Sequence, residues 1–332
     1  MNYDNGPQYA EQDAERMIRV GGFTRTRRIV RIWLFWTALS VVLFLCWLAF
    51  LFHRAVQAGG GSNAGMAFYD SLPGVVPPAI CVAKLHGAVL AYRKAFKQSY
   101  VLPAMKTIFT DLKYGMFWGI EPPEELLDLT KIQSRARLFR GEDHIYARFK
   151  DIGFEQSDIV IKDDLNMRLD RKKADYVLPV FRGQWMVFDF NKSFRCQLRV
   201  VQRGFHHARG RRSIFKKDRL AQQMETESAV FNKEFSVYAQ NEHEAFYLLT
   251  PVMIERIQSL TAHTRGKMTL CFAGKKLHIL IQNRRSNFEP GSIFLPLQDE
   301  KKLQEVRKQI EVTTQFIDEL RLDNDLFQKQ ED

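Results

Sequence analysis

The hydrophobic pattern of the chain begins with an uncharged apolar run, IWLFWTALSVVLFLCWLAFLF, at residues 32–52. With a rise of about 1.5 Å per residue, a helix of this length spans a hydrocarbon core about 30 Å thick. The apolar part of a secretory signal peptide is shorter, about 7 to 15 residues, and begins closer to the N-terminus. The run therefore predicts a transmembrane helix.

A second run, VVPPAICVAKLHGAVLAY at residues 75–92, is apolar but contains two prolines, Lys84 and His86. On the insertion scale its Val, Ile and Leu residues favour the bilayer by about 3 kcal/mol in total, and one central lysine opposes insertion by about as much. Two interpretations remain open. The run either crosses the membrane and completes a helical hairpin, or lies on the membrane surface.

Basic residues flank the two runs unequally. They precede the first run and follow the second: Arg25, Arg27, Arg28, Arg31, Arg93, Lys94 and Lys97. The connection between the runs is close to neutral, with Arg54 and Asp70. Because positively charged flanks stay in the cytoplasm, this pattern favours a hairpin with the N-terminus and the following domain inside. A single crossing would place that domain outside.

After the apolar runs, the pattern first predicts helices. Over residues 92–115 apolar side chains recur at helical spacing, Pro103 predicts a kink, and Gly115 predicts the end of the helix. The stretch EPPEELLDLTKI, residues 121–132, predicts a short helix with acidic residues in its first turn.

Strands are predicted next. Residues 143–161 and 176–201 alternate apolar and polar positions and are rich in β-branched and aromatic residues, which is typical of half-buried antiparallel strands. The stretch KMTLCFAGKKLHILI, residues 267–281, predicts a further strand pair with a tight hairpin at Gly274 and Lys275.

The stretch FNKEFSVYAQNEHEAFYLLTPVMIERI, residues 231–257, predicts a strand, a polar crossing and a helix start. Phe231, Phe235 and Val237 fit the strand. Thr250 is a good N-cap and Pro251 a good first residue for a helix that ends near residue 260. Near the C-terminus a regular apolar stripe predicts a helix that packs on the sheet. Its members are Leu303, Val306, Ile310, Thr313, Ile317 and Leu320.

The expected fold class is α+β, with a transmembrane helix or hairpin followed by a mainly antiparallel sheet covered by helices. The expected organisation is a basic polar leader (1–31), a transmembrane helix (32–52), a loop (53–74), a possible second membrane segment (75–92), a soluble α+β domain (93–322) and a polar tail (323–332).

Composition adds a charge argument. The 332 residues have a formal net charge of +11, which favours anionic partners such as phospholipid headgroups or nucleic acid. The cysteines lack the paired spacing of a disulfide framework or a zinc site, and they favour a reducing compartment. They are Cys46, Cys81, Cys196 and Cys271.

The densest basic segment is RGFHHARGRRSIFKKDR, residues 203–219. Its basic residues are Arg203, Arg209, Arg211, Arg212, Lys216, Lys217 and Arg219, opposed by Asp218. It is either a solvated loop or a contact with anionic lipid, at about 1 kcal/mol per basic residue near a charged leaflet. These two interpretations are equally favoured because the chain is already tethered to a membrane. Single-stranded nucleic acid is the least favoured ligand.

No catalytic, cofactor-binding or metal-ligating residue is assigned from the sequence. His243 lies between two glutamates, but Tyr247 stands where the second histidine of H-E-x-x-H would be, so solvated loop charges are the better interpretation. The stretch FAGKKLHI lacks the spacing of a phosphate-binding loop.

Four stretches together resemble a known family. They are FRGEDHIYARFKDIGFEQSDI, FRGQWMVFDFNKSF, the stretch at residues 231–257, and NFEP at residues 287–290. They are similar to the bacterial family known as domain of unknown function 3137, over about residues 92–322. The most specific part includes L-T-P-x-x-x-E-R, matched by Thr250, Pro251, Glu255 and Arg256. The resemblance implies two N-terminal transmembrane helices and a cytoplasmic α+β domain, with no activity or cofactor assigned, and it favours the hairpin.

Two functions are compatible with these patterns. The favoured one is a non-catalytic binding or scaffold module at the inner face of the cell membrane, whose basic segment contacts anionic lipid or an acidic protein partner. The alternative is a membrane-tethered enzyme with an active site that the sequence does not reveal. For that alternative, Glu255, Arg256 and His144 are the first residues to inspect.

Overall fold

The computed structural model describes residues 6–57, 64–120, 137–163, 181–205, 222–264, 266–283, 286–294 and 299–320. The chain divides into two compact units. Unit 1 comprises Met1–Pro103 and Glu289–Lys302, and unit 2 comprises Ala104–Phe288 and Leu303–Asp332.

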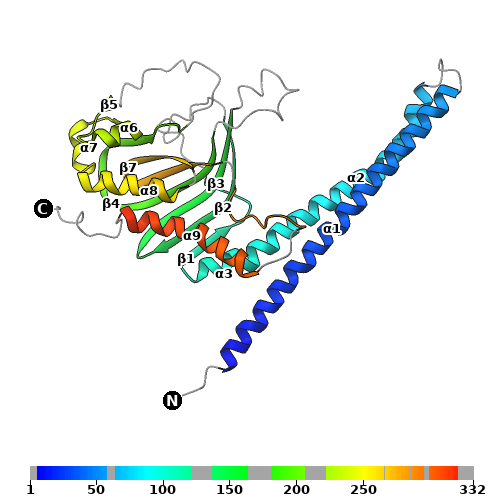
Figure 1. Ribbon diagram of the computed structural model, residues 1–332, viewed down its shortest axis with the longest axis horizontal. Coiled ribbons are helices and arrows are strands. Elements are labelled where there is room, and N and C mark those ends of the chain that lie inside the picture. The colour runs from blue at the N-terminus through cyan, green and yellow to red at the C-terminus, as the bar shows by residue number, and fades with distance from the viewer. Residues whose placement is uncertain are drawn as a thin grey trace. The chain divides into compact units, whose positions relative to one another are not determined.

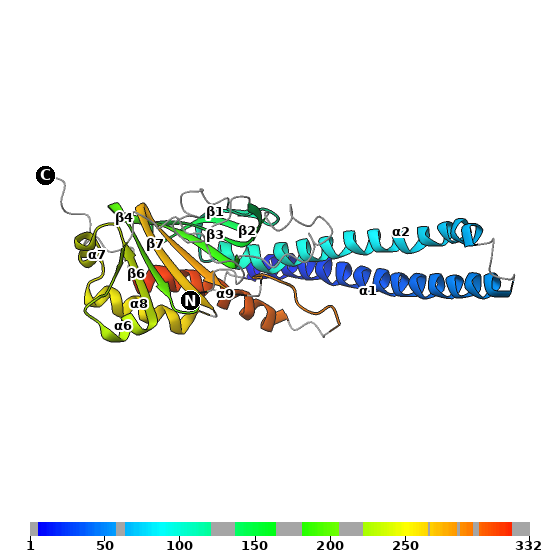
Figure 2. The ribbon, with the colours of Figure 1, turned by 90° about the horizontal axis from the view of Figure 1, so that it is seen from above.

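Unit 1 contains a helical hairpin (Figure 1). Helices α1 (Gly6–Gln57) and α2 (Ala64–Phe96) lie side by side and antiparallel, as Figure 2 also shows. The chain continues through the π-helical turn η1 (Lys97–Val101) into α3 (Leu102–Lys106). Two stretches, Gly21–Arg54 and Gly74–Lys106, are long and apolar enough to cross a membrane.

The two long helices contact each other near both ends of the hairpin. Buried side chains of the two helices include Phe23, Val30, Ala88 and Tyr92 toward one end and Leu51 toward the other. The rings of Phe23 and Tyr92 stack with their centroids 4.9 Å apart. Toward the opposite end, a Cβ added to Gly74 would lie 3.1 Å from Phe44 and from Trp47. Such close helix contact favours association within a bilayer, where apolar side chains gain little from leaving lipid.

Helical structure extends further into the connection than the pattern predicts. α1 continues to Gln57 and α2 begins at Ala64, so that residues 53–57 and 64–74 are helical rather than part of a loop. Ala64, Met66 and Ala67 are good helix formers, whereas the glycine run before them is not.

The helix predicted over residues 92–115 is correct to Lys106 and wrong beyond it. Residues 110–115 form strand β1 (Thr110–Gly115), because pairing with a neighbouring strand overrides a local helical pattern. Pro103 is accommodated just after the wider turn of η1, where its missing N–H removes one helical hydrogen bond.

In the part of unit 2 that the structure describes, seven strands form one sheet, and the neighbouring strands pair antiparallel. After β1 come β2 (Arg137–Phe149), β3 (Ile152–Asp163), β4 (Phe181–Gln202), β5 (Gln222–Met224), β6 (Phe235–Ala239) and β7 (Lys267–Gln282). Their order is β1-β2-β3-β4-β6-β5, and β7 also pairs with β4. The mainly antiparallel α+β fold is therefore confirmed.

Strand β4 organises the sheet. Its first half lies between β3 and β7, and its second half lies between β6 and β7 (Figure 2). Trp185 pairs with Leu280 of β7, and further along Val200 pairs with Leu270 of β7 and Val237 of β6. One long strand thus holds both halves of the sheet together.

Both faces of the sheet near β4 are buried. On one face Phe188 stacks on Phe316 of α9 (Asp299–Leu320), with ring centroids 6.4 Å apart. Thr313 of α9 donates a hydrogen bond to Gln156 of β3. A second apolar cluster contains Ile159, Ile161, Phe181, Trp185, Val187, Phe205 and Leu280. The predicted packing of the C-terminal helix on the sheet is confirmed.

The remaining helices are α6 (Ala229–Glu234), α7 (Glu242–Leu248) and α8 (Pro251–His263). α8 lies beside α9 (Figure 1), and Ser259 donates a hydrogen bond of 2.9 Å to Glu319. The predicted cap of α8 is confirmed, because the Thr250 hydroxyl accepts from the Met253 amide at 3.3 Å.

Three local predictions were wrong. Phe231 lies in α6 rather than in a strand, since Ser228 caps that helix. His243 lies in the first turn of α7 rather than in a loop. Gly274 does not close a hairpin: β7 runs straight through it, and the residue, with φ of 58°, lies at an irregularity in the pairing with β4. A glycine with positive φ suits a bulge as well as a turn.

Candidate functional site

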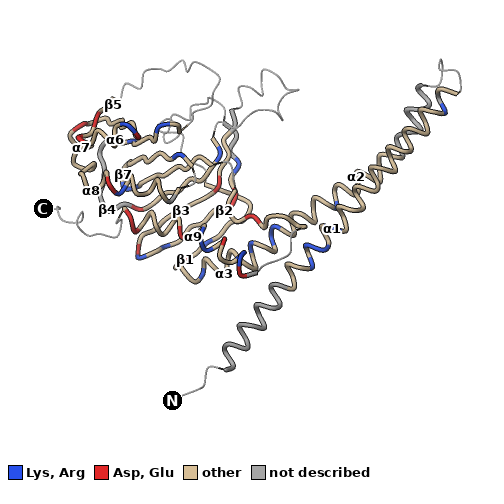
Figure 3. Tube along the Cα trace, viewed as in Figure 1, with Lys and Arg blue, Asp and Glu red and all other residues tan. Residues whose placement is uncertain are grey.

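Basic residues gather at one end of the hairpin, where the apolar stretch of α1 begins and that of α2 ends. Figure 3 shows lysine and arginine gathered on both helices there. Arg25, Arg28, Arg31 and Lys94 are exposed, whereas Arg27 has only 7% of its surface exposed. We call Arg25, Arg27, Arg28, Arg31, Arg93 and Lys94 the hairpin basic cluster.

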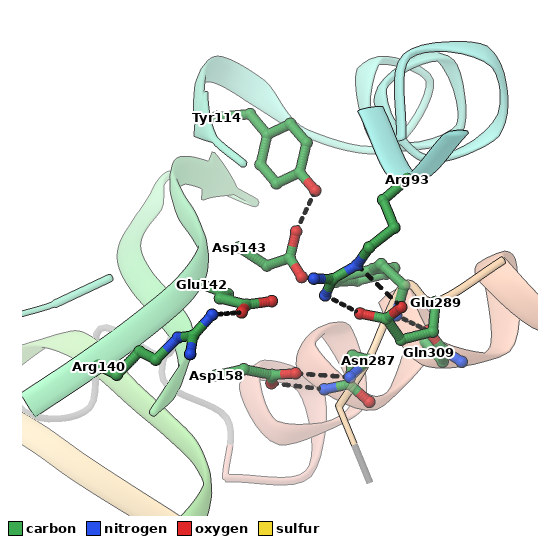
Figure 4. Close-up of polar contacts among 10 residues, drawn as sticks. Arg93, Tyr114, Arg140, Glu142, Asp143, Asp158, Asn287, Glu289 and Gln309 are labelled. Carbon is green, nitrogen blue, oxygen red and sulfur yellow. Dashed lines mark hydrogen bonds and ion pairs between the residues drawn. The ribbon is translucent and has the colours of Figure 1, made fainter. Parts of the chain in front are cut away.

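A short segment of unit 1, residues 289–294, lies against this cluster. The Ile293 carbonyl accepts hydrogen bonds from Arg27 Nε at 2.9 Å and from Arg31 Nε and Nη2 at 2.9 and 2.8 Å. Glu289 forms an ion pair with Arg93, in which Arg93 Nε lies 3.2 Å from Oε2 (Figure 4). The segment therefore fixes the positions of three arginines.

The chemistry of this cluster suits anions. A carbonyl oxygen shared by two guanidinium groups leaves most of their positive charge uncompensated. Arg27 Nη2 is buried and has no hydrogen-bond partner among the residues that the structure describes. Phosphate and carboxylate groups match the fork of a guanidinium and are its strongest hydrogen-bond acceptors.

Unit 2 has a second polar cluster where β2 departs from regular pairing between Glu142 and Ile145. Asp143, in this irregular stretch, has φ of 58° and is 2% exposed. It accepts a hydrogen bond from the hydroxyl of Tyr114 on β1 (Figure 4). Bulges of this kind redirect side chains and are frequent beside functional sites.

His144 is the titratable group of this cluster. Its ring lies 4.3 Å from that of Trp118, and Nε2 lies 3.9 Å from Glu155 Oε2. Burial lowers the pKa of His144, and the nearby Glu155 carboxylate partly offsets this by raising it. A histidine that is neutral at pH 7 can accept a proton, so this is where the enzymatic alternative would be tested.

For His144 we expect a pKa below its ordinary value in the intact protein. Glu155→Gln should lower it further, because the variant removes the carboxylate that favours the charged imidazole. A histidine side-chain NMR titration of both proteins measures the two values. A rise of the pKa in Glu155→Gln would contradict this account of the environment.

The other residues considered for an enzyme lie elsewhere in the fold. Glu255 and Arg256 are on α8, and Glu255 is exposed, whereas His144 is on β2 (Figure 1). Within the described residues, no group of three or more His, Cys, Asp or Glu side chains is arranged to hold a metal ion.

Of the predicted anion-binding segment, the structure describes Arg203. It follows β4 in a turn, where its amide donates to the Glu234 carbonyl at 2.8 Å and its guanidinium to the Asn232 carbonyl at 3.0 Å. The other members lie outside the described residues: Arg209, Arg211, Arg212, Lys216, Lys217 and Arg219. The hairpin basic cluster was recognised from sequence only as topology-determining flanks, and its contacts with Glu289 and Ile293 were missed.

The NFEP stretch is held in place by polar contacts at its start. Within unit 2, the Asn287 side chain donates to Asp158 of β3 at 3.0 Å, and the Phe288 amide donates to Gln309 of α9 at 2.8 Å (Figure 4). These bonds hold the start of the NFEP stretch to β3 and α9.

Residues 179–322 match the family model described as "Protein of unknown function (DUF3137)". This match supports the family resemblance over these residues. Three of the four stretches that carry the resemblance lie inside the match, and the stretch at residues 139–159 lies before it. The region that matches the family model therefore begins just before β4 and ends just after α9.

No curated protein matches the chain in sequence. Among solved structures, the crystal structure of the mycobacterial trehalose monomycolate transport factor A (TtfA) matches 69% of this chain and 93% of its own, at 9% identity and a TM-score of 0.32. A likeness of this size carries no argument about the function of this chain.

Proposed function

We propose that this protein is a membrane-anchored binding module whose hairpin basic cluster holds anionic headgroups at the inner face of the cell membrane. The observation that carries the proposal is the placement of basic side chains at one end of the hairpin. Arg27, Arg31 and Arg93 lie there, and Arg54 lies at the other end. Because the more positively charged flank of a membrane segment stays in the cytoplasm, this asymmetry favours a cytoplasmic location for the end that carries the cluster.

The energetics support contact with lipid. Each lysine or arginine near an anionic leaflet contributes about 1 kcal/mol, so the exposed members of the cluster outweigh a single paired carboxylate. Aligned with the headgroups, they would hold unit 1 at a fixed depth. The basic segment at residues 203–219 extends the proposal, because any basic segment of a tethered domain is drawn to the same surface or to an acidic partner.

We expect the full-length protein, in nanodiscs of phosphatidylcholine and phosphatidylglycerol, to retain phosphatidylglycerol preferentially. Replacing Arg25, Arg28 and Lys94 by serine should reduce this enrichment about tenfold. Each of these charges contributes roughly 1 kcal/mol near an anionic leaflet, and screening by salt lowers the total contribution of the three. Replacing Arg209, Arg211 and Arg212 by serine tests the second segment in the same way. Mass spectrometry of the retained lipids measures the ratio.

A matched control removes three charges from exposed positions of unit 2: Lys233, Lys275 and Lys276. This triple serine variant should keep the enrichment, and an equal loss would show that net charge alone is responsible. Orientation is checked in intact cells. A cysteine at Gly61 should react with a membrane-impermeant thiol reagent and one at Arg209 should not, in a chain whose own cysteines are replaced.

A further inference from the structure

Lys84 stands at the centre of the second apolar stretch. It lies midway between Val75 and Arg93, about 13 Å along the helix from each at 1.5 Å per residue. Its side chain is exposed, whereas Ala88 and Tyr92 of the same helix are buried. In a hairpin that crosses the bilayer, Lys84 is therefore left uncovered by α1 at the depth of the hydrocarbon core.

The two apolar stretches of the hairpin offer no negative charge to this lysine. Neither Gly21–Arg54 nor Gly74–Lys106 contains an aspartate or glutamate. Ionisable residues at the bilayer centre are costly, and they pair with one another or face a polar cavity. A partner for Lys84 must therefore come from outside these two stretches.

The surface around Lys84 is shaped for close approach. Ala79, Ala83, Gly87 and Ala91 recur every four residues along α2, and each is exposed. A Cβ added to Gly87 would meet nothing within 4 Å, so this position is open. Small residues at this spacing let the backbone of a second helix come near, which shortens the reach of a polar pair between helices.

We propose that this face of α2, defined by Ala83, Lys84, Gly87 and Ala91, docks a transmembrane helix of another protein that carries an aspartate or glutamate near the bilayer midplane. Charge complementarity selects this occupant. A second copy of the chain would bring another Lys84 and no carboxylate to the interface. The inference rests on the proposed function only in requiring that α2 cross the membrane.

The probe is a synthetic transmembrane peptide of about 20 leucine and alanine residues with one central aspartate. The full-length protein, labelled at a cysteine replacing Gly61, is reconstituted with the labelled peptide in phosphatidylcholine vesicles, and association is read by energy transfer. We expect the aspartate peptide to bind about tenfold more tightly than its asparagine or leucine counterparts.

Variants of the protein locate the contact. Lys84→Leu should abolish the preference for aspartate and Lys84→Arg should keep it, while Lys94→Leu removes the same charge outside the hydrocarbon core and should have no effect. Gly87→Leu should weaken binding by filling the open position, whereas Val82→Leu, an enlargement on another exposed side of α2, should not.

Two results would overturn the inference: equal binding of the three peptides, or aspartate-dependent binding that survives in Lys84→Leu. Self-association of the chain that depends on Gly87 and not on Lys84 would also overturn it, in favour of a second copy. Cysteine labelling of the same vesicles separates the two proposals. If positions 61 and 209 lie on the same side, α2 does not cross and the proposed placement of the domain at the inner face fails. If they lie on opposite sides, a negative peptide result concerns Lys84 alone.

Discussion

Replacing Gly183 by alanine should lower the free energy of unfolding of unit 2 by about 3 kcal/mol, as expected for severe overpacking. Gly183 lies in β4, where an added Cβ would stand 1.9 Å from the Ile281 carbonyl oxygen and 2.9 Å from its carbon. These are backbone atoms of β7, so no side-chain rotation relieves the contact. The two strands would have to move apart where Trp185 and Leu280 pair.

Urea denaturation of the full-length protein in detergent micelles, followed by near-ultraviolet circular dichroism, measures this change. Gly22→Ala is the matched control, because a Cβ at Gly22 meets nothing within 4 Å and lies in helix α1. It should unfold like the wild type. A Gly183→Ala protein with an unchanged urea midpoint would show that β4 and β7 are not paired as described.

The features that sequence predicted best depend on patterns that few forces can override. A charge-free apolar run such as residues 32–52 has no stable alternative to a bilayer or a core, and α9 shows one uninterrupted stripe. The cap at Thr250 was predictable because it depends only on the next three residues. Each of these signals is local and is reinforced by composition.

The failures occurred where a local signal allows two structures. Gly274 has φ of 58°, which a hairpin and a bulge both use, and only the pairing of β7 with β4 distinguishes them. Residues 110–115 resemble the end of a helix until β2 is there to pair with them. Choosing between such alternatives requires knowing which distant strand is available.

The site depends even more on distant contacts. Arg93 and Glu289 form an ion pair although they are far apart in the chain, and nothing near either residue indicates the other. Arg27 was visible in the sequence as a basic flank, but its bond to the Ile293 carbonyl joins it to a backbone atom, which has no sequence signature. The charge of the cluster was therefore predictable, and its geometry was not.

Acidification from pH 7 to pH 4 should remove about 3 kcal/mol of the stability of unit 2 through His278 alone. This histidine of β7 is 6% exposed, and its Nδ1 accepts a hydrogen bond from Trp185 Nε1 at 3.4 Å. Burial, with a smaller contribution from Lys276, lowers its pKa from 6.5 to about 4. Between these two values the unfolded chain binds a proton that the folded one does not, so the stability is present above pH 6.5 and is lost as the pH falls toward 4.

Urea denaturation at several pH values between 7 and 4 measures the slope. His278→Gln should flatten it, because the amide stays neutral and its oxygen can still accept from Trp185. Part of the acid sensitivity should remain, since burial also lowers the pKa of His144 in the same direction. His243→Gln is the control, because it removes a histidine whose side chain is exposed. If His278→Gln is as sensitive to acid as the wild type, the buried, neutral state assigned to His278 between β4 and its neighbours is wrong.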